Sequence, residues 1–158
     1  MKIINKTKLI LVGMVIILMS IFMTGCGDNK SVVDTEKFAE VCEEFGYVVE
    51  EQDTTDHNYL TSYQIATGTT HSGVLHYIVA NDDTVAKELF KTNVEAFDEE
   101  YGEDVSKDTQ EDENYQKCVI KNDTDYVYVS RVDNTLFVSV VSVVDIGTIN
   151  ELIEEINY

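Results

Sequence analysis

Apolar residues recur along most of the chain at the spacing expected of helices and strands that each bury one side. The segment that starts at Asp34, a helix-capping residue, has apolar positions at i, i+3, i+4 and i+7, and it stops at Gly46. We therefore predict a helix here, with these residues on its buried face: Phe38, Val41, Cys42 and Phe45. A second helix is predicted between the capping sequence NDDT and Gly102, and a third from the capping box at 148–151.

Six further segments alternate with a period of two or are short apolar runs, and both patterns are typical of strands. Their sequences are YVVEEQ, YLTSYQIAT, VLHYIVA, NYQKCVIK, DYVYVSRV and TLFVSVVSVV. GTTHSG reads as a hairpin loop, and NDTD and DN are typical tight turns, which makes the last three strands an antiparallel meander. The final strand is apolar on both sides, so we expect it at the centre of the sheet. Residues 103–113 are predicted to be an acidic loop.

The predicted order of elements is α-β-β-β-α-β-β-β-α. This order favours the α+β class, with a twisted antiparallel sheet and about three helices packed mainly on one face. We expect one globular domain at 34–158, a size that is sufficient to bury a core.

The first 25 residues have a different pattern. Lys2, Lys6 and Lys8 precede an almost wholly apolar stretch at 9–23, which is shorter than the roughly 20 residues that a membrane-spanning helix needs. A positive start followed by a short apolar stretch and small residues is typical of a secretory signal peptide.

The stretch ends in Met23-Thr24-Gly25-Cys26, which resembles the lipobox of bacterial lipoproteins, with Met23 where leucine is commonest. The resemblance implies cleavage before Cys26, a lipid on the Cys26 sulfur and attachment to the outer face of the cell membrane. Residues 1–25 would then be the signal peptide and 26–33 a flexible tether. The chain is also similar to small surface lipoproteins of Gram-positive bacteria, a resemblance that implies no activity. The alternative is ordinary secretion with Cys26 as a free thiol.

The negative net charge of the chain limits the kinds of partner that it can bind. The chain has 30 acidic and 11 basic residues, a formal charge of −19, and loss of the three signal lysines would change it to −22. Such a charge repels phosphate backbones, so nucleic-acid binding is not expected, and it leaves basic peptides, proteins or divalent cations as charged partners. A charge that serves only solubility is the simpler interpretation.

The cysteines, histidines and acidic residues are the candidates for catalysis and metal binding. Cys42 and Cys118 would form an even pair in an exported domain, which is typical of a disulfide, and both are predicted to point into one core; two buried free thiols are the alternative. His57, His71 and His76 have no metal-ligand spacing. Residues 98–113 hold nine acids but no calcium-loop spacing, so a solvated loop is favoured and calcium binding stays open. We predict no catalytic residue, metal or cofactor.

The remaining candidate is a set of strand tyrosines beside the chain's one arginine. A sheet face lined by these residues would bind an extended peptide or a glycan: Tyr63, Tyr77, Tyr126, Tyr128 and Arg131. The alternative is that the tyrosines form cross-strand pairs and that Arg131 pairs with an acid. The sequence therefore predicts a lipid-anchored, non-catalytic binding module, or else an accessory subunit of an envelope complex; an envelope hydrolase is the least favoured class. Its ligand, its partner and its oligomeric state are not indicated.

Overall fold

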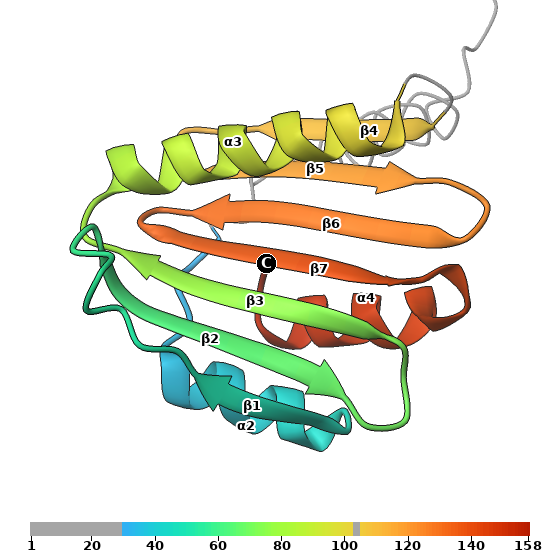
Figure 1. Cartoon of the computed structure of the whole chain (residues 1–158), viewed down its shortest axis with the longest axis horizontal. Helices are drawn as coiled ribbons and strands as arrows, with labels where there is room; N and C mark the ends of the chain where they lie inside the picture. Colours follow the sequence, from blue (N-terminus) through green and yellow to red (C-terminus); the bar gives the residue numbers. More distant parts are fainter. Residues whose placement is uncertain (1–29, 103–104) are drawn as a thin grey trace, which may run out of the picture.

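The computed structural model describes residues 30–102 and 105–158. Within these residues the sheet has seven antiparallel strands in the order β1-β2-β3-β7-β6-β5-β4 (Figure 1). Its strands are β1 (Tyr47–Glu51), β2 (Leu60–Gly68), β3 (Gly73–Ala80), β4 (Ser106–Glu111), β5 (Tyr115–Lys121), β6 (Asp125–Val132) and β7 (Thr135–Ser142). The helices are α2 (Thr35–Glu44), α3 (Asp83–Tyr101) and α4 (Ile146–Glu155), the last preceded by the short 3₁₀ helix η1 (Val143–Asp145). The predicted α+β class and the predicted order are confirmed, with one strand added.

The predicted ends of the first two helices are also confirmed. The Asp34 carboxylate accepts a hydrogen bond from the Lys37 backbone N–H at 2.7 Å, and Asp82 caps α3 in the same way through Val85. Gly46 has φ +81°, a conformation that favours glycine and lets the chain turn sharply from α2 into β1. β7 is the central strand and is largely buried, as its apolar pattern on both sides predicted.

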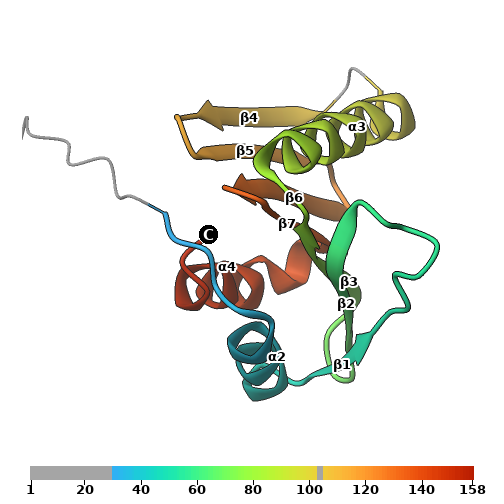
Figure 2. The ribbon, with the colours of Figure 1, turned by 90° about the vertical axis from the view of Figure 1, so that its left-hand side faces the viewer.

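The helices cover the two faces of the sheet unequally, and Figure 2 shows α2 and α4 on one side and α3 on the other. On the α2/α4 side the helices bury a cluster that includes Phe38, Leu75, Tyr77, Phe137 and Leu152. On the α3 side the buried cluster comes from β5, β6 and β7, and it packs against Leu89, Phe90, Val94 and Phe97 of α3. Each face therefore has one covered half, and the uncovered halves lie diagonally opposite each other.

The predicted loop at 103–113 is wrong, because residues 106–111 form strand β4. Every side chain of β4 is exposed, so no apolar alternation marks it in the sequence. The strand forms by pairing along its whole length with β5, from Ser106 opposite Lys121 to Glu111 opposite Gln116. A charged, exposed edge strand of this kind also resists pairing with other chains.

The capping box predicted at 148–151 is also wrong. Helix α4 begins at Ile146, so Thr148 lies inside it, and Asp145 occupies the N-cap position. The Asp145 side chain makes no cap hydrogen bond and instead accepts hydrogen bonds from Ser72 in the β2–β3 hairpin. A long-range contact therefore replaces the local cap that the sequence suggested.

The domain begins before the predicted boundary at Asp34. The Val33 side chain packs against the core, and the Val33 carbonyl accepts a hydrogen bond from Tyr77. The Lys30 ammonium donates to the Tyr158 carbonyl at 3.0 Å, and Ser31 accepts from Asn157 at 2.9 Å. Residues 30–33 thus belong to the domain and not to the predicted tether, while the predicted signal peptide, the lipobox-like motif and Cys26 lie outside the described residues. In the described part of the chain, no helix has the length and hydropathy needed to cross a membrane.

Candidate functional site

The predicted tyrosine-lined face does not exist, because its residues lie on two sides of the sheet. Tyr77, Tyr126 and Tyr128 belong to the cluster beneath α2 and α4 and are 0%, 8% and 5% exposed. Tyr63 and Arg131 point to the α3 side, since Tyr63 lies opposite Ile78 and Arg131 opposite Leu136, both of which face α3. Strand parity carries this information in the sequence: Tyr126 and Arg131 are an odd number of residues apart, so one strand presents them on opposite faces.

Arg131 is a structural residue. Its side chain is fully buried, and Nη1 donates to the carboxylate of Asp83 in the first turn of α3 and to the Asp133 carbonyl. Its Nε donates to Oε1 of Gln116 at 2.8 Å. The alternative interpretation of Arg131, a pairing with a neighbouring acid, is therefore the correct one.

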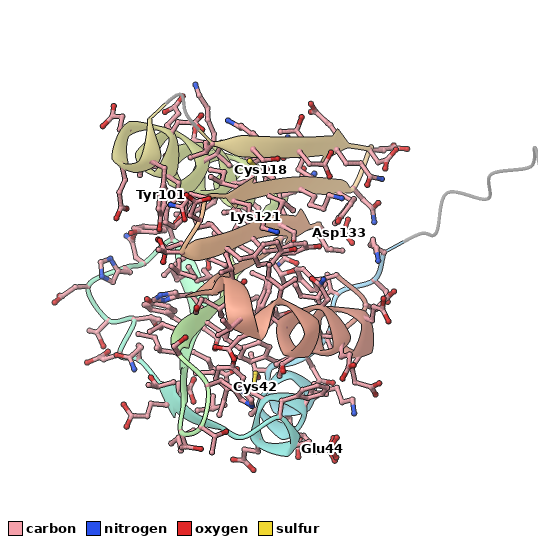
Figure 3. All side chains as sticks on the ribbon, turned by 90° about the vertical axis from the view of Figure 1, so that its right-hand side faces the viewer. Cys42, Glu44, Tyr101, Cys118, Lys121 and Asp133 are labelled. Carbon is pink, nitrogen blue, oxygen red and sulfur yellow. The ribbon has the colours of Figure 1, made fainter. Side chains whose placement is uncertain are left out.

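Cys42 and Cys118 are free thiols on opposite sides of the sheet, so the predicted shared core is wrong and no bridge links them. Figure 3 shows Cys118 at the top of the molecule and Cys42 at the bottom. Burial raises the pKa of Cys42 to about 12, and burial also raises the pKa of Cys118. Both thiols are therefore protonated at neutral pH and are poor nucleophiles.

The three histidines lie in three separate places. His57 contacts Tyr59 in the exposed β1–β2 loop, and Nδ1 of His71 lies 3.3 Å from the Asp145 carboxylate. His76 stacks on Tyr63, whose hydroxyl lies 2.8 Å from its Nδ1, and burial lowers the pKa of His76. Among the described residues, no three histidine, cysteine or acidic side chains lie close enough together to hold a metal ion.

The strongest candidate for a ligand site is a groove on the α2/α4 side, where the helices leave β4 and β5 uncovered. Strand pairing places Tyr128, Val119 and Asp108 in one row across β6, β5 and β4, and Lys117 and Gln110 in the next row. Helix α4 and Lys30 form the wall of the groove that faces these strands. The groove has a volume of about 480 Å³ and is lined by Lys30, Asp108, Gln110, Asp112, Tyr115, Lys117, Val119, Tyr126, Tyr128, Asn150 and Tyr158.

Tyrosine hydroxyls and amides form much of the groove wall. The hydroxyls of Tyr115 and Tyr128 lie 3.2 Å apart, and the Tyr126 hydroxyl donates to Oδ1 of Asn150 at 3.2 Å. Burial raises the pKa of Tyr126 and Tyr128, so both hydroxyls keep their protons at neutral pH. Tyr126 donates its proton to Asn150, and one of Tyr115 and Tyr128 donates to the other, so these hydroxyls can offer a ligand mainly acceptor oxygens.

The charged groups of the groove balance one another. Lys117 pairs with Asp108 at 3.2 Å, and Lys30 lies with its ammonium 5.8 Å from the centre of the Tyr115 ring. With Asp112, the side chains of the lining include two ammonium groups and two carboxylates, so their formal charges cancel, whereas the whole chain carries −19. The groove thus differs electrostatically from the molecule as a whole.

Two of the five predicted binding residues, Tyr126 and Tyr128, line this groove, but sequence reasoning missed its charged members. Lys30 was assigned to the tether, and Asp108 and Gln110 to a loop. The alternation of Ser106, Asp108 and Gln110 on one side of β4 was the available signal, and it is readable only once β4 is known to be a strand.

Comparisons with known proteins add little to this site. No protein-family model and no curated protein matches the chain. Among solved structures, the chain is similar to one described as a GTP binding regulator from Thermotoga maritima, with a TM-score of 0.47 and 13% sequence identity over 79% of this chain and 85% of that one. This similarity is too low to support an inference about function.

Proposed function

We propose that the protein is a non-catalytic binding module, anchored to the outer face of the cell membrane through a lipid on Cys26. The observation that carries the binding role is the groove beside α4, where hydroxyl, amide, ammonium and carboxylate groups converge on one concave surface. The anchor rests on the resemblance of residues 23–26 to a lipobox.

The chemistry of the groove limits its ligand. Because the lining charges cancel, a ligand with a large net charge gains little from the groove itself. The hydroxyls and amides instead suit a ligand rich in hydrogen-bonding groups, uncharged or zwitterionic, such as a peptide segment or a polyhydroxylated envelope component. The tyrosines of the lining are at most 8% exposed, which leaves little ring surface for stacking, so hydrogen bonding would dominate recognition.

The groove would lie close to the membrane. Lys30, which lines the groove, is four positions after Cys26, and an extended chain of this length spans at most about 14 Å. A ligand bound there would therefore be held near the lipid surface, as expected for a component of the cell envelope.

The positions of the reactive side chains support a role without turnover. A catalytic site needs a nucleophile or metal, a base and groups that stabilise developing charge, all in one place. Here both thiols are buried and protonated, and each histidine contacts a different part of the fold.

A photoreactive amino acid in place of Gln110 tests the binding role in intact cells. Gln110 lines the groove, and Glu154, an exposed residue of α4, is the matched control. We expect a defined cross-linked product at position 110 that is lost when Tyr126→Phe and Lys117→Ala are added, and none at position 154. Equal products at both positions, or a product that survives the added changes, would exclude the groove.

The anchor is tested separately by Cys26→Ala. We expect this variant to appear in the medium or to persist as an uncleaved precursor. A variant that stays membrane-bound with a normal mature N-terminus would show that Cys26 carries no lipid, whatever the groove binds.

A further inference from the structure

The second uncovered half of the sheet lies on the α3 side, over β1, β2 and β3. Strand pairing defines its rows. Across β1, β2, β3 and β7, the first row of paired residues is Val48, Thr67, Val74 and Val140. The next row across β1, β2 and β3 is Glu50, Ile65 and His76. A third row places Tyr63 beside Ile78. Ile78 and Val140 belong to the cluster beneath α3, and we call the other residues of these rows the open face: Val48, Glu50, Tyr63, Ile65, Thr67, Val74 and His76.

The open face is mainly apolar and accessible. Val48 is 52% exposed, and Ile65 and Val74 are partly exposed, although β-branched residues of this kind are usually buried. Helix α3 packs over β5 to β7 and reaches β3 at Ile78, and no other helix of the described residues covers the remainder of this half. A contiguous apolar surface that is partly exposed in this way is typical of a protein-interaction site.

The charged residues around the open face are all acidic. Residues 38–86, which include β1, β2 and β3, hold nine acidic residues and no lysine or arginine. Glu50 lies on the face itself, Asp53 and Asp56 are exposed in the adjacent loop at 52–59, and Glu88 lines a shallow hollow between that loop and α3. Figure 2 shows this loop projecting on the α3 side of the sheet.

We propose that the open face is a docking surface for a basic, apolar segment of a partner protein. The segment would place apolar side chains against Val48, Ile65 and Val74 and lysine or arginine side chains against the surrounding carboxylates. A second copy of this chain is a poor occupant, because it would bring the same negative charge to the interface.

The position of the open face suits such a partner. The described chain begins at Lys30 on the α2/α4 side, so the open face lies on the side of the sheet opposite to the start of the domain (Figure 2). A domain anchored through residues 26–29 would then present the open face away from the membrane. The docking surface itself does not depend on the anchor or on the groove.

Two synthetic peptides of twelve residues test the proposal with the domain in solution. One alternates leucine with lysine, and the other alternates serine with lysine, so that both carry the same charge. We expect the leucine peptide to bind at least about tenfold more tightly at physiological salt, because only it can bury apolar surface. Equal affinity would mean that the peptides bind through charge alone and would overturn the proposal.

Substitutions then locate the binding surface. Val48→Thr with Val74→Thr keeps the shape and strand propensity of the open face but makes it polar. We expect this variant to lose about tenfold in affinity for the leucine peptide and nothing for the serine peptide. Val32→Thr, the same change at an exposed valine that lies outside both the open face and the groove, is the control and should change neither; an equal loss in the control would overturn the assignment.

Two further measurements keep the test decisive. Thr67→Lys changes an exposed residue in the middle of the same row, so this variant should fold normally. It should weaken the binding of both peptides because it adds a positive charge to the docking surface. Sedimentation equilibrium of the unmodified domain should show a monomer. A dimer that Val48→Thr with Val74→Thr dissociates would identify a second copy as the occupant and overturn the proposed partner.

Discussion

Arg131 on β6 and Asp83 at the start of α3 form an ion pair in which the guanidinium is fully buried and the carboxylate is half-exposed. The pair fixes the N-terminal end of α3 against the sheet. It also accounts for the only arginine of the chain, since a planar guanidinium can satisfy Asp83, Gln116 and the Asp133 carbonyl together.

This pair gives the first prediction. Asp83→Asn should destabilise the domain by about 1–3 kcal/mol in urea unfolding, because it leaves a buried charge without its counter-ion. Arg131→Met added to Asp83→Asn should recover part of the loss. Lys87→Ala is the control: Lys87 pairs with the same carboxylate at the surface, and its removal should cost less than about 1 kcal/mol. A larger effect from Lys87→Ala would mean that the exposed pair is the important one.

The second prediction concerns the thiols. Because burial raises the pKa of both Cys42 and Cys118, neither should react with iodoacetamide at pH 8 within minutes in the folded domain, and both should react after unfolding. Mass spectrometry without reductant should give two free thiols. A mass two hydrogens lower, with no reaction after unfolding, would contradict their placement on opposite sides of the sheet.

The third prediction concerns the start of the domain. A chain that begins at Asp34 loses the contacts of Lys30, Ser31 and Val33, and it should be less stable than one that begins at Lys30 by about 1–3 kcal/mol. The backbone N–H groups near Val33 should also exchange more slowly than those of an unstructured peptide. Equal stability of the two chains would restore the boundary at Asp34.

The fourth prediction is a pH dependence from Asp145. Hydrogen bonds from the Ser72 side chain, then from the Ser72 backbone and His71, lower the pKa of Asp145 below its usual value. The ionised carboxylate therefore stabilises the fold above pH about 4, and this contribution is lost as the pH falls through the lowered pKa. Asp145→Asn should cost about 1 kcal/mol at pH 7, and its difference from the natural chain should shrink below pH 4.

A carboxylate in a local turn provides the control for this experiment. Hydrogen bonds from Thr55 also lower the pKa of Asp53, but they join residues two apart in an exposed loop. Asp53→Asn should leave the unfolding transition nearly unchanged at both pH values. If Asp145→Asn behaves in the same way, the contact between Asp145 and the β2–β3 hairpin does not contribute to stability.

Much of the fold follows from the sequence because its signals are local. Helix caps at Asp34 and Asp82, the turn at Gly46 and the alternation within β2, β5 and β6 each depend on residues close together in the chain. The position of β7 at the centre was also predictable, since a strand that is apolar on both sides must be covered on both sides. The class, the meander of β5 to β7 and the order of the elements other than β4 thus follow from the sequence alone.

The rest was decided by contacts between distant residues. β4 is a strand only because β5 supplies its hydrogen bonds, and α4 starts where it does beside a hairpin some 70 residues earlier. Strand parity separates Tyr126 from Arg131, and coverage by α2, α3 and α4 decides which half of each face stays open. The groove joins Lys30, Asp108 and Tyr158, three residues that no periodicity connects, so only the packed sheet and helices bring their side chains together.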